Sequence, residues 1–218
     1  MEFEIRLEQQ GDWQAVENLT REAFWNVHEP GCSEHLLMQR LRSSPAFIKE
    51  LSMVAVANKE IVGHIAYTRA VVTSPEGIRH EVLCFGPLSV LPTRQNYGIG
   101  SALVEHTKDL ACKMGFGAIL IYGDPLYYER LGFVKAERFD IYAPDGMYAD
   151  ALQACELYEG ALRGIMGAFH EDEVFDVAPE DVEAFDQNFP PKVKGFLPSQ
   201  ARFMEVVSMR RPRQVKPF

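Results

Sequence analysis

The stretch LSVLPTRQNYGIGSALVEH, residues 88–106, joins a β-rich run to a helical pattern through a turn that contains Gly98 and Gly100. The first N–H groups of a helix have no acceptor within the helix and carry a partial positive charge, and a glycine turn before them lets an anion approach the backbone. Residues 95–101 therefore have the means to bind a pyrophosphate. A tight turn that only connects a strand to a helix explains the same glycines and is the alternative.

The glycine spacing excludes two common nucleotide-binding loops. A Walker loop requires GxxxxGK[ST], and the Rossmann fingerprint requires a third glycine, three residues after the second. The turn lacks the first pattern, and Leu103 stands where the second pattern needs glycine. The sequence therefore supports neither of these two nucleotide-binding classes.

Composition narrows the range of partners. The chain has 218 residues, 47% of them hydrophobic, and a net charge of −9, so it can bury a core but has no general attraction for nucleic acid. Its four cysteines form no CxxC pair and no cysteine–histidine cluster, which predicts reduced thiols and no metal site. The segment MEFEIRLEQQGDW carries charges where a secretion signal is apolar, and no run reaches the ~18 apolar residues of a membrane span. We expect a cytoplasmic protein that binds neither nucleic acid nor membrane.

The predicted elements follow one another as a strand, two helices, an antiparallel meander, and a strand–turn–helix–strand unit. Alternating or continuous apolar runs predict strands, and apolar residues at helical spacing predict helices. Helices are predicted at 12–25, 33–44 and 98–115, and strands at 3–7, 51–58, 60–74, 80–92, 117–123, 134–142 and 151–160. The acidic segment after about residue 165 is less regular, and its interleaved apolar residues predict that it packs against the late strands.

Two motifs at the proper separation carry a family resemblance. Gln95, Gly98 and Gly100 match a Q/R-x-x-G-x-G/A turn that follows a strand ending in L-x-V, and YYERLGF at 127–133 matches an aromatic pair leading into LGF. In these features the chain resembles the GNAT N-acetyltransferase superfamily, and most closely its bacterial predicted-acetyltransferase branch. The resemblance implies an α/β (α+β) fold with a mixed, largely antiparallel central sheet, flanked by helices and splayed at an acetyl-CoA site. We expect residues 1–160 to form the acetyltransferase domain and 161–218 a C-terminal extension packed on the same domain.

The resemblance also implies how acetyl-CoA is held. The backbone of Leu88, Ser89 and Val90 would pair with the pantetheine arm as an added strand does. Gly86 and Pro87 support this reading, because within a strand they mark a bulge or a place where pairing stops, although an ordinary bend explains them too. The residues expected at the pyrophosphate are Gln95, Asn96, Tyr97, Gly98, Ile99, Gly100 and Ser101.

Acetyl transfer to an amine needs a proton donor for the departing thiolate and a base for the amine. Tyr128 stands where the family keeps its donor, and Tyr127 is expected to pack. The family glutamate on the strand before L-x-V, four residues ahead of the leucine, is replaced by Cys84. Glu81 is the nearest carboxylate and our candidate base, although in an ideal strand it faces the opposite side. Other side chains that could work through water are His28, Glu29, Glu34, His35 and His64.

Two functions remain open from the sequence. The first is direct transfer of acetyl from acetyl-CoA to a primary amine of a small molecule or protein, in a ternary complex and without a metal. The second is a non-catalytic acyl-CoA-binding regulatory module, which the loss of the glutamate at position 84 keeps open. The mixed aromatic and charged segment 25–37 suits a cationic amine, and a homodimer is compatible with the sequence.

Overall fold

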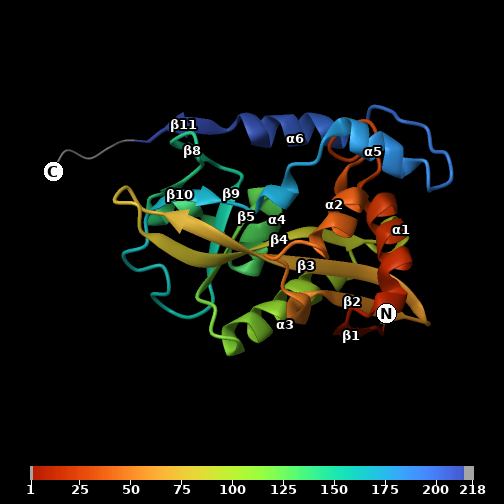
Figure 1. Cartoon of the computed structure of the whole chain (residues 1–218), viewed down its shortest axis with the longest axis horizontal. Coiled ribbons are helices and arrows are strands. Elements are labelled where there is room, and N and C mark those ends of the chain that lie inside the picture. Colours follow the sequence, from red (N-terminus) through yellow and green to blue (C-terminus); the bar gives the residue numbers. More distant parts are fainter. Residues whose placement is uncertain (1, 214–218) are drawn as a thin grey trace. The chain divides into compact units, whose positions relative to one another are not determined.

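The computed structural model describes residues 2–213 (Figure 1). By the contacts among their residues, these divide into two compact units. The first unit comprises 2–68, 85–110 and 172–201, and the second comprises 69–84, 111–171 and 202–213. Each unit is thus assembled from segments far apart in the sequence. Two long strands, β3 (Glu60–Thr73) and β4 (Arg79–Val90), contribute residues to both units.

The other strands and the α-helices are joined by 3₁₀ turns and loops. The helices are α1 (Trp13–Phe24), α2 (Glu34–Leu41), α3 (Ile99–Lys113), α4 (Pro125–Tyr128), α5 (Pro179–Asp186) and α6 (Pro198–Ser208). The other strands are β1 (Glu4–Leu7), β2 (Met53–Ala57), β5 (Ala118–Tyr122), β6 (Val134–Lys135), β7 (Ile141–Tyr142), β8 (Met147–Ala149), β9 (Leu152–Glu156), β10 (Gly167–His170) and β11 (Arg210–Pro212). Within residues 2–213, no helix combines the length and the hydrophobicity that crossing a bilayer requires.

The strands pair in the order β1-β2-β3-β4-β5-β9-β6, and β10 pairs with β3 and β7. The pairs β1–β2, β2–β3, β5–β9, β6–β9 and β10–β3 are antiparallel. The pairs β4–β5 and β10–β7 are parallel. This pattern confirms the predicted α/β (α+β) class with a mixed, largely antiparallel sheet.

In the first unit, helices cover both faces of the β2–β3 pair. Val54 and Ala55 are successive strand residues and therefore point to opposite faces. Val54 belongs to a buried cluster with α1 and α2, which lie side by side (Figure 1). Gly63 pairs with Ala55, and a Cβ at Gly63 would lie 2.6 Å from Ile99 and 3.1 Å from Leu103, so α3 packs closely on the other face. The buried cluster on the α1–α2 side comprises Val16, Leu37, Met38, Leu41, Val54 and Ala66.

The acidic C-terminal segment adds to this same cluster. Val174, Phe175 and Val177 pack against it. Arg21 of α1, whose side chain is 3% exposed, donates two hydrogen bonds to Asp186 of α5, at 2.6 and 3.1 Å. The prediction that these apolar residues pack against the late strands is therefore wrong. Their pattern predicts burial, but it does not say which apolar surface buries them.

A buried polar network lies beside β1. Arg42 donates to Glu8 at 2.7 Å and to Glu17 at 2.6 Å, and the Ser52 hydroxyl donates to Glu8 at 2.8 Å. His64 Nε2 lies 3.8 Å from Glu8 Oε2. Burial by itself raises the pKa of the Glu8 carboxyl, but His64 and Arg42 outweigh burial and lower this pKa to about 2.

The second unit contains β5, whose first four residues are buried, and its antiparallel neighbour β9. The single strand predicted at 134–142 is wrong, because a 3₁₀ turn at Ala136–Phe139 separates β6 from β7. Asp140 ends this turn in the left-handed region, with φ +55°. Aspartate tolerates this conformation better than most residues, and a short apolar alternation does not reveal such a break.

Candidate active site

The glycine turn leads directly into α3. Gly98 and Asn96 have positive φ angles of +82° and +65°, and the turn from Gln95 to Gly98 is exposed. Ala102 N donates to the Gly98 carbonyl at 2.9 Å, which begins the hydrogen-bond ladder of the helix. The N–H groups of the residues just before Ala102 come ahead of this ladder, as the first N–H groups of any helix do. The first turn of α3 contains no acidic residue that would oppose an anion. The geometry is therefore that of a helix N-terminus open to an anionic group.

The end of β4 lies in the same unit as this turn. The strand continues through Gly86 and Pro87, whose peptide bond is cis, to Val90. Ser89 is buried, and its hydroxyl donates to Thr20 Oγ1 at 3.1 Å. The side chain of Gln95 donates to the Val90 carbonyl at 3.3 Å, which ties the turn to the strand that precedes it.

Tyr128, in the second unit, is the last residue of the short helix α4. Asp124 caps this helix by accepting a hydrogen bond from Leu126 N at 3.0 Å. Arg202 of α6 donates to both oxygens of Asp124, at 2.9 and 3.0 Å. An ion pair between residues far apart in the sequence thus holds the cap of the helix that carries Tyr128.

The Tyr128 ring is closely surrounded. A Cβ at Gly123 would overlap Cε2 of this ring and lie 2.6 Å from its Cδ2, so the ring occupies space that only glycine leaves open. The rings of Tyr127 and Phe133 pack against it, with centroids 4.9 and 5.6 Å away. Burial, together with Tyr127 and Cys84, raises the pKa of the Tyr128 phenol. The phenol therefore keeps its proton at neutral pH.

The two candidate positions on β4 have different surroundings. The Glu81 side chain is 56% exposed, and one of its carboxylate oxygens lies 3.4 Å from Arg69 Nε. Cys84 is buried, and its Sγ lies 3.4 Å from Oε1 of Glu171. The sequence predictions did not include Glu171, and its only sequence signal is its place in an acidic segment.

Two histidines considered in the sequence are buried parts of the first unit. His35 Nε2 lies 3.3 Å from Asp186 Oδ1, and burial lowers the pKa of His35. His64 is fully buried beside the Ser52 hydroxyl at 3.1 Å, and burial lowers its pKa as well. His28 is more exposed and lies 2.9 Å from Glu34. No feature of the sequence placed any of these histidines beside the glycine turn or beside Tyr128.

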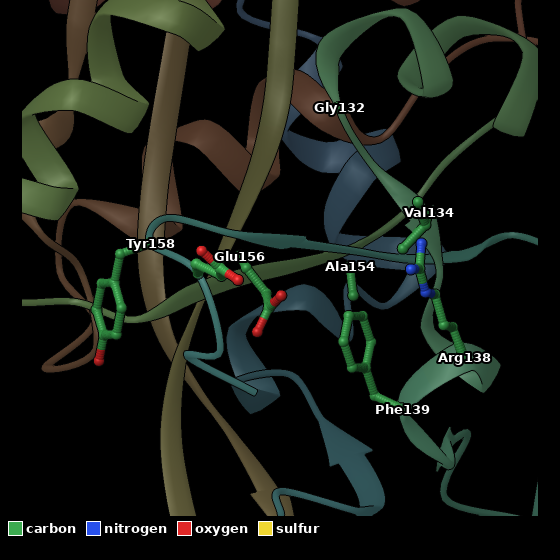
Figure 2. A pocket seen from close by; sticks show the side chains of 8 residues that line it. Gly132, Val134, Arg138, Phe139, Ala154, Glu156 and Tyr158 are labelled. Atoms are coloured by element: carbon green, nitrogen blue, oxygen red, sulfur yellow. The ribbon is translucent and has the colours of Figure 1, made fainter. Parts of the chain in front are cut away.

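The second unit also has a hollow of about 350 Å³, beside β6 and β9. Figure 2 shows the Phe139 ring reaching toward Ala154, Arg138 beside Val134, and Tyr158 at the opposite end. None of its lining residues is among the sequence-predicted site residues. Within residues 2–213, no group of three or more histidine, cysteine or acidic side chains is placed to hold a metal ion.

Comparison with known proteins identifies the segment that contains both motifs. Residues 49–135 match the family model described as an acetyltransferase (GNAT) domain. An uncharacterized N-acetyltransferase of Escherichia coli K12, YhbS, is 27% identical over 176 residues, which span 79% of this chain and 98% of the relative.

Solved structures show the same likeness in three dimensions. The crystal structure of Escherichia coli YhbS in complex with CoA has a TM-score of 0.70 and 26% identity, with 79% of this chain and 91% of that chain covered. A GNAT family acetyltransferase from Brucella melitensis in complex with acetyl-CoA has a TM-score of 0.64 and 25% identity, with 80% and 99% covered. Together with the two motifs and the sheet order, these matches show that residues 49–135 resemble a GNAT acetyltransferase domain and that the chain is similar in sequence and fold to GNAT N-acetyltransferases.

Proposed function

We propose that the protein transfers the acetyl group of acetyl-CoA to a primary amine, directly and in a ternary complex. The observation that carries this proposal is the exposed turn 95–98, which opens α3 with positive φ at Gly98 and no acidic residue in the first helical turn. This arrangement suits a pyrophosphate. The two relatives whose structures contain CoA and acetyl-CoA support the same choice of donor.

The chain offers backbone groups for two parts of acetyl-CoA. The backbone of Leu88, Ser89 and Val90 would pair with the pantetheine arm, in the manner of strand addition. The pyrophosphate would be held by Gln95, Asn96, Tyr97, Gly98, Ile99, Gly100 and Ser101. The exposed turn residues and the first-turn N–H groups of α3 fit this role, because they combine donors with a partial positive charge.

Tyr128 is our proposed proton donor to the departing thiolate. A phenol can donate only while protonated, and the Tyr128 phenol is protonated at neutral pH, since burial raises its pKa from an ordinary value that is already well above 7. Glu81 is the base proposed from the sequence, although its carboxylate is exposed and lies beside Arg69. The acceptor is proposed to be a primary amine of a small molecule or protein, and the mixed aromatic and charged segment 25–37 is proposed to influence which amine is accepted.

We also propose that residues 1–160 constitute the acetyltransferase domain and that 161–218 form an extension of it. No disulfide joins the four cysteines of the chain. Reduced cysteines are typical of a reducing compartment, so we propose that the protein works in the cytoplasm.

A screen of primary amines that follows release of free CoA thiol tests the activity, and calorimetry with acetyl-CoA tests donor binding. Acetyl-CoA binding together with CoA release that depends on an amine is the expected result. Binding without release for any amine would favour the non-catalytic acyl-CoA-binding module instead. Absence of binding would refute the proposal.

A further inference from the structure

The second unit contains a group of side chains, around the buried Cys84, that the sequence motifs do not join. Cys84 of β4 lies with its Sγ 3.4 Å from Oε1 of Glu171, the residue that follows β10. Tyr122 ends β5, and its pKa is raised by burial and then by the negative charge of Glu171. Cys84 in turn contributes to the raised pKa of the Tyr128 phenol. We call Cys84, Glu171, Tyr122 and Tyr128 the Cys84 cluster.

We propose that Glu171 is the base that takes the proton from the amine acceptor, in place of the carboxylate that position 84 lacks. This inference rests on the acetyltransferase activity proposed above. It gives the C-terminal extension a part in the chemistry, because Glu171 lies beyond the segment that matches the family model, which ends at residue 135.

The fold fixes Glu171 through β10. Residues Ala168, Phe169 and His170 pair antiparallel with Thr73, Val72 and Val71 of β3, so Glu171 follows directly from a hydrogen-bonded ladder. The strand begins at Gly167, where a Cβ would overlap the Thr73 carbonyl oxygen and lie 2.8 Å from Ser74 Cα.

A second contact anchors this strand from its other side. Phe169 is fully buried, and its ring centroid lies 5.9 Å from that of Tyr122. Glu171 is therefore a half-buried carboxylate that directly follows an anchored strand, and a positioned base requires such support.

Cys84 is suited to orient this carboxylate. Burial, with a further contribution from Glu171, raises the pKa of the Cys84 thiol well above its usual value. The thiol is therefore protonated at neutral pH, and its S–H donates to the carboxylate. A protonated thiol is a weak nucleophile, so this environment favours direct transfer over an acyl-cysteine intermediate.

Glu81 has a different environment on the same strand. Its side chain is 56% exposed and lies beside the Arg69 guanidinium. The geometry thus distinguishes a half-buried carboxylate held beside the Cys84 thiol from an exposed one on the same strand as Cys84.

The proton balance assigns one task to each residue. Glu171 takes a proton from the acceptor ammonium, and the freed lone pair forms the N–C bond to the thioester carbonyl carbon. The C–S bond breaks, its electron pair remains on sulfur, and Tyr128 donates the phenol proton to it. The second nitrogen proton restores Tyr128, and the proton on Glu171 passes to water. The sum is an amide, free CoA and one released proton.

The test compares Glu171→Gln with wild type, using acetyl-CoA and a panel of spermidine, Nα-acetyl-lysine and a short peptide with a free α-amine. At pH 7 we expect kcat/KM for the accepted amine to fall by at least about 100-fold, the lower end for a positioned base. The defect should shrink as the pH rises toward the amine's pKa, about 8 for an α-amine and about 10 for a lysine, because the amine then needs no base. Acetyl-CoA affinity by calorimetry should stay unchanged.

Matched variants separate the possible outcomes. Glu173→Gln removes an exposed carboxylate of the same acidic segment and should leave turnover unchanged. A Glu171→Gln defect that is equal at every pH, with a lowered melting temperature, would mean a structural role and overturn the proposal. Normal turnover in Glu171→Gln with loss in Glu81→Gln would return the base to Glu81. If wild type binds acetyl-CoA but none of the amines causes release of CoA, the proposed function is refuted, and this inference is refuted with it.

Discussion

Replacing Gly123 with alanine is expected to disable Tyr128 while leaving the tyrosine itself unsubstituted. The added Cβ would overlap Cε2 of the Tyr128 ring and lie 2.6 Å from Cδ2, whereas ordinary carbon contacts are about 3.5 to 4 Å. The ring must therefore move by about 1 Å. A displacement of about 1 Å at a reacting group can cost roughly 100-fold in rate, and overpacking typically costs about 1 to 3 kcal/mol of stability.

The assay is steady-state CoA release with an accepted amine, for Gly123→Ala, Tyr128→Phe and the double variant. We expect Gly123→Ala to lower turnover by roughly 100-fold. In the Tyr128→Phe background the same alanine should have little further effect, because the hydroxyl whose position it disturbs is already absent. Acetyl-CoA affinity should be preserved in all three variants.

Two results would refute this reasoning. One is wild-type turnover in a folded Gly123→Ala variant, which would mean that the ring position does not matter. The other is an equal loss of turnover from Gly123→Ala with and without the Tyr128 hydroxyl, which would mean that the alanine acts through the fold. A thermal melt of each variant separates the stability cost from the catalytic one.

Three further predictions concern the turn, the proton donor and the buried network. Gly100→Val should weaken acetyl-CoA binding by about 1 to 3 kcal/mol in calorimetry, since the side chain would enter the space proposed for the pyrophosphate; unchanged affinity in a folded variant would remove that assignment. Tyr128→Phe should lower turnover by about 10² to 10⁴ with little change in acetyl-CoA affinity, and Tyr127→Phe should do much less; near-normal turnover with chemistry rate-limiting would return Tyr128 to a packing role. The lowered pKa of Glu8, about 2, stabilises the fold above pH 4.5, and this contribution should disappear as the pH falls from 4.5 to 2. Urea unfolding should therefore show that Glu8→Gln is less stable than wild type at pH 7 and that the two are nearly equally stable near pH 2. A stability difference that stays constant with pH would contradict the Glu8–Arg42 pair as the source of the contribution.

The family motifs could be recognised in the sequence because each depends on the conformation of a few neighbouring residues. Gly98 reveals itself because a turn into a helix at this point needs positive φ, and the structure gives it +82°. The alternation and length of the apolar runs likewise predicted β3, β4 and β5. A break such as the 3₁₀ turn at Ala136–Phe139 was missed, because few residues carry too little periodicity to distinguish it from a strand.

Long-range placement was the part that the sequence left undetermined. The sequence by itself determined the sheet-forming runs, the glycine turn and the position of Tyr128, because each depends on residues within one or two turns of the chain. Only the tertiary structure brought Glu171 to Cys84 across 87 residues and Arg202 to Asp124 across 78. Such contacts depend on how β10 and α6 pack. The apolar residues of the C-terminal segment predict that it is buried, but they do not specify the surface against which it packs.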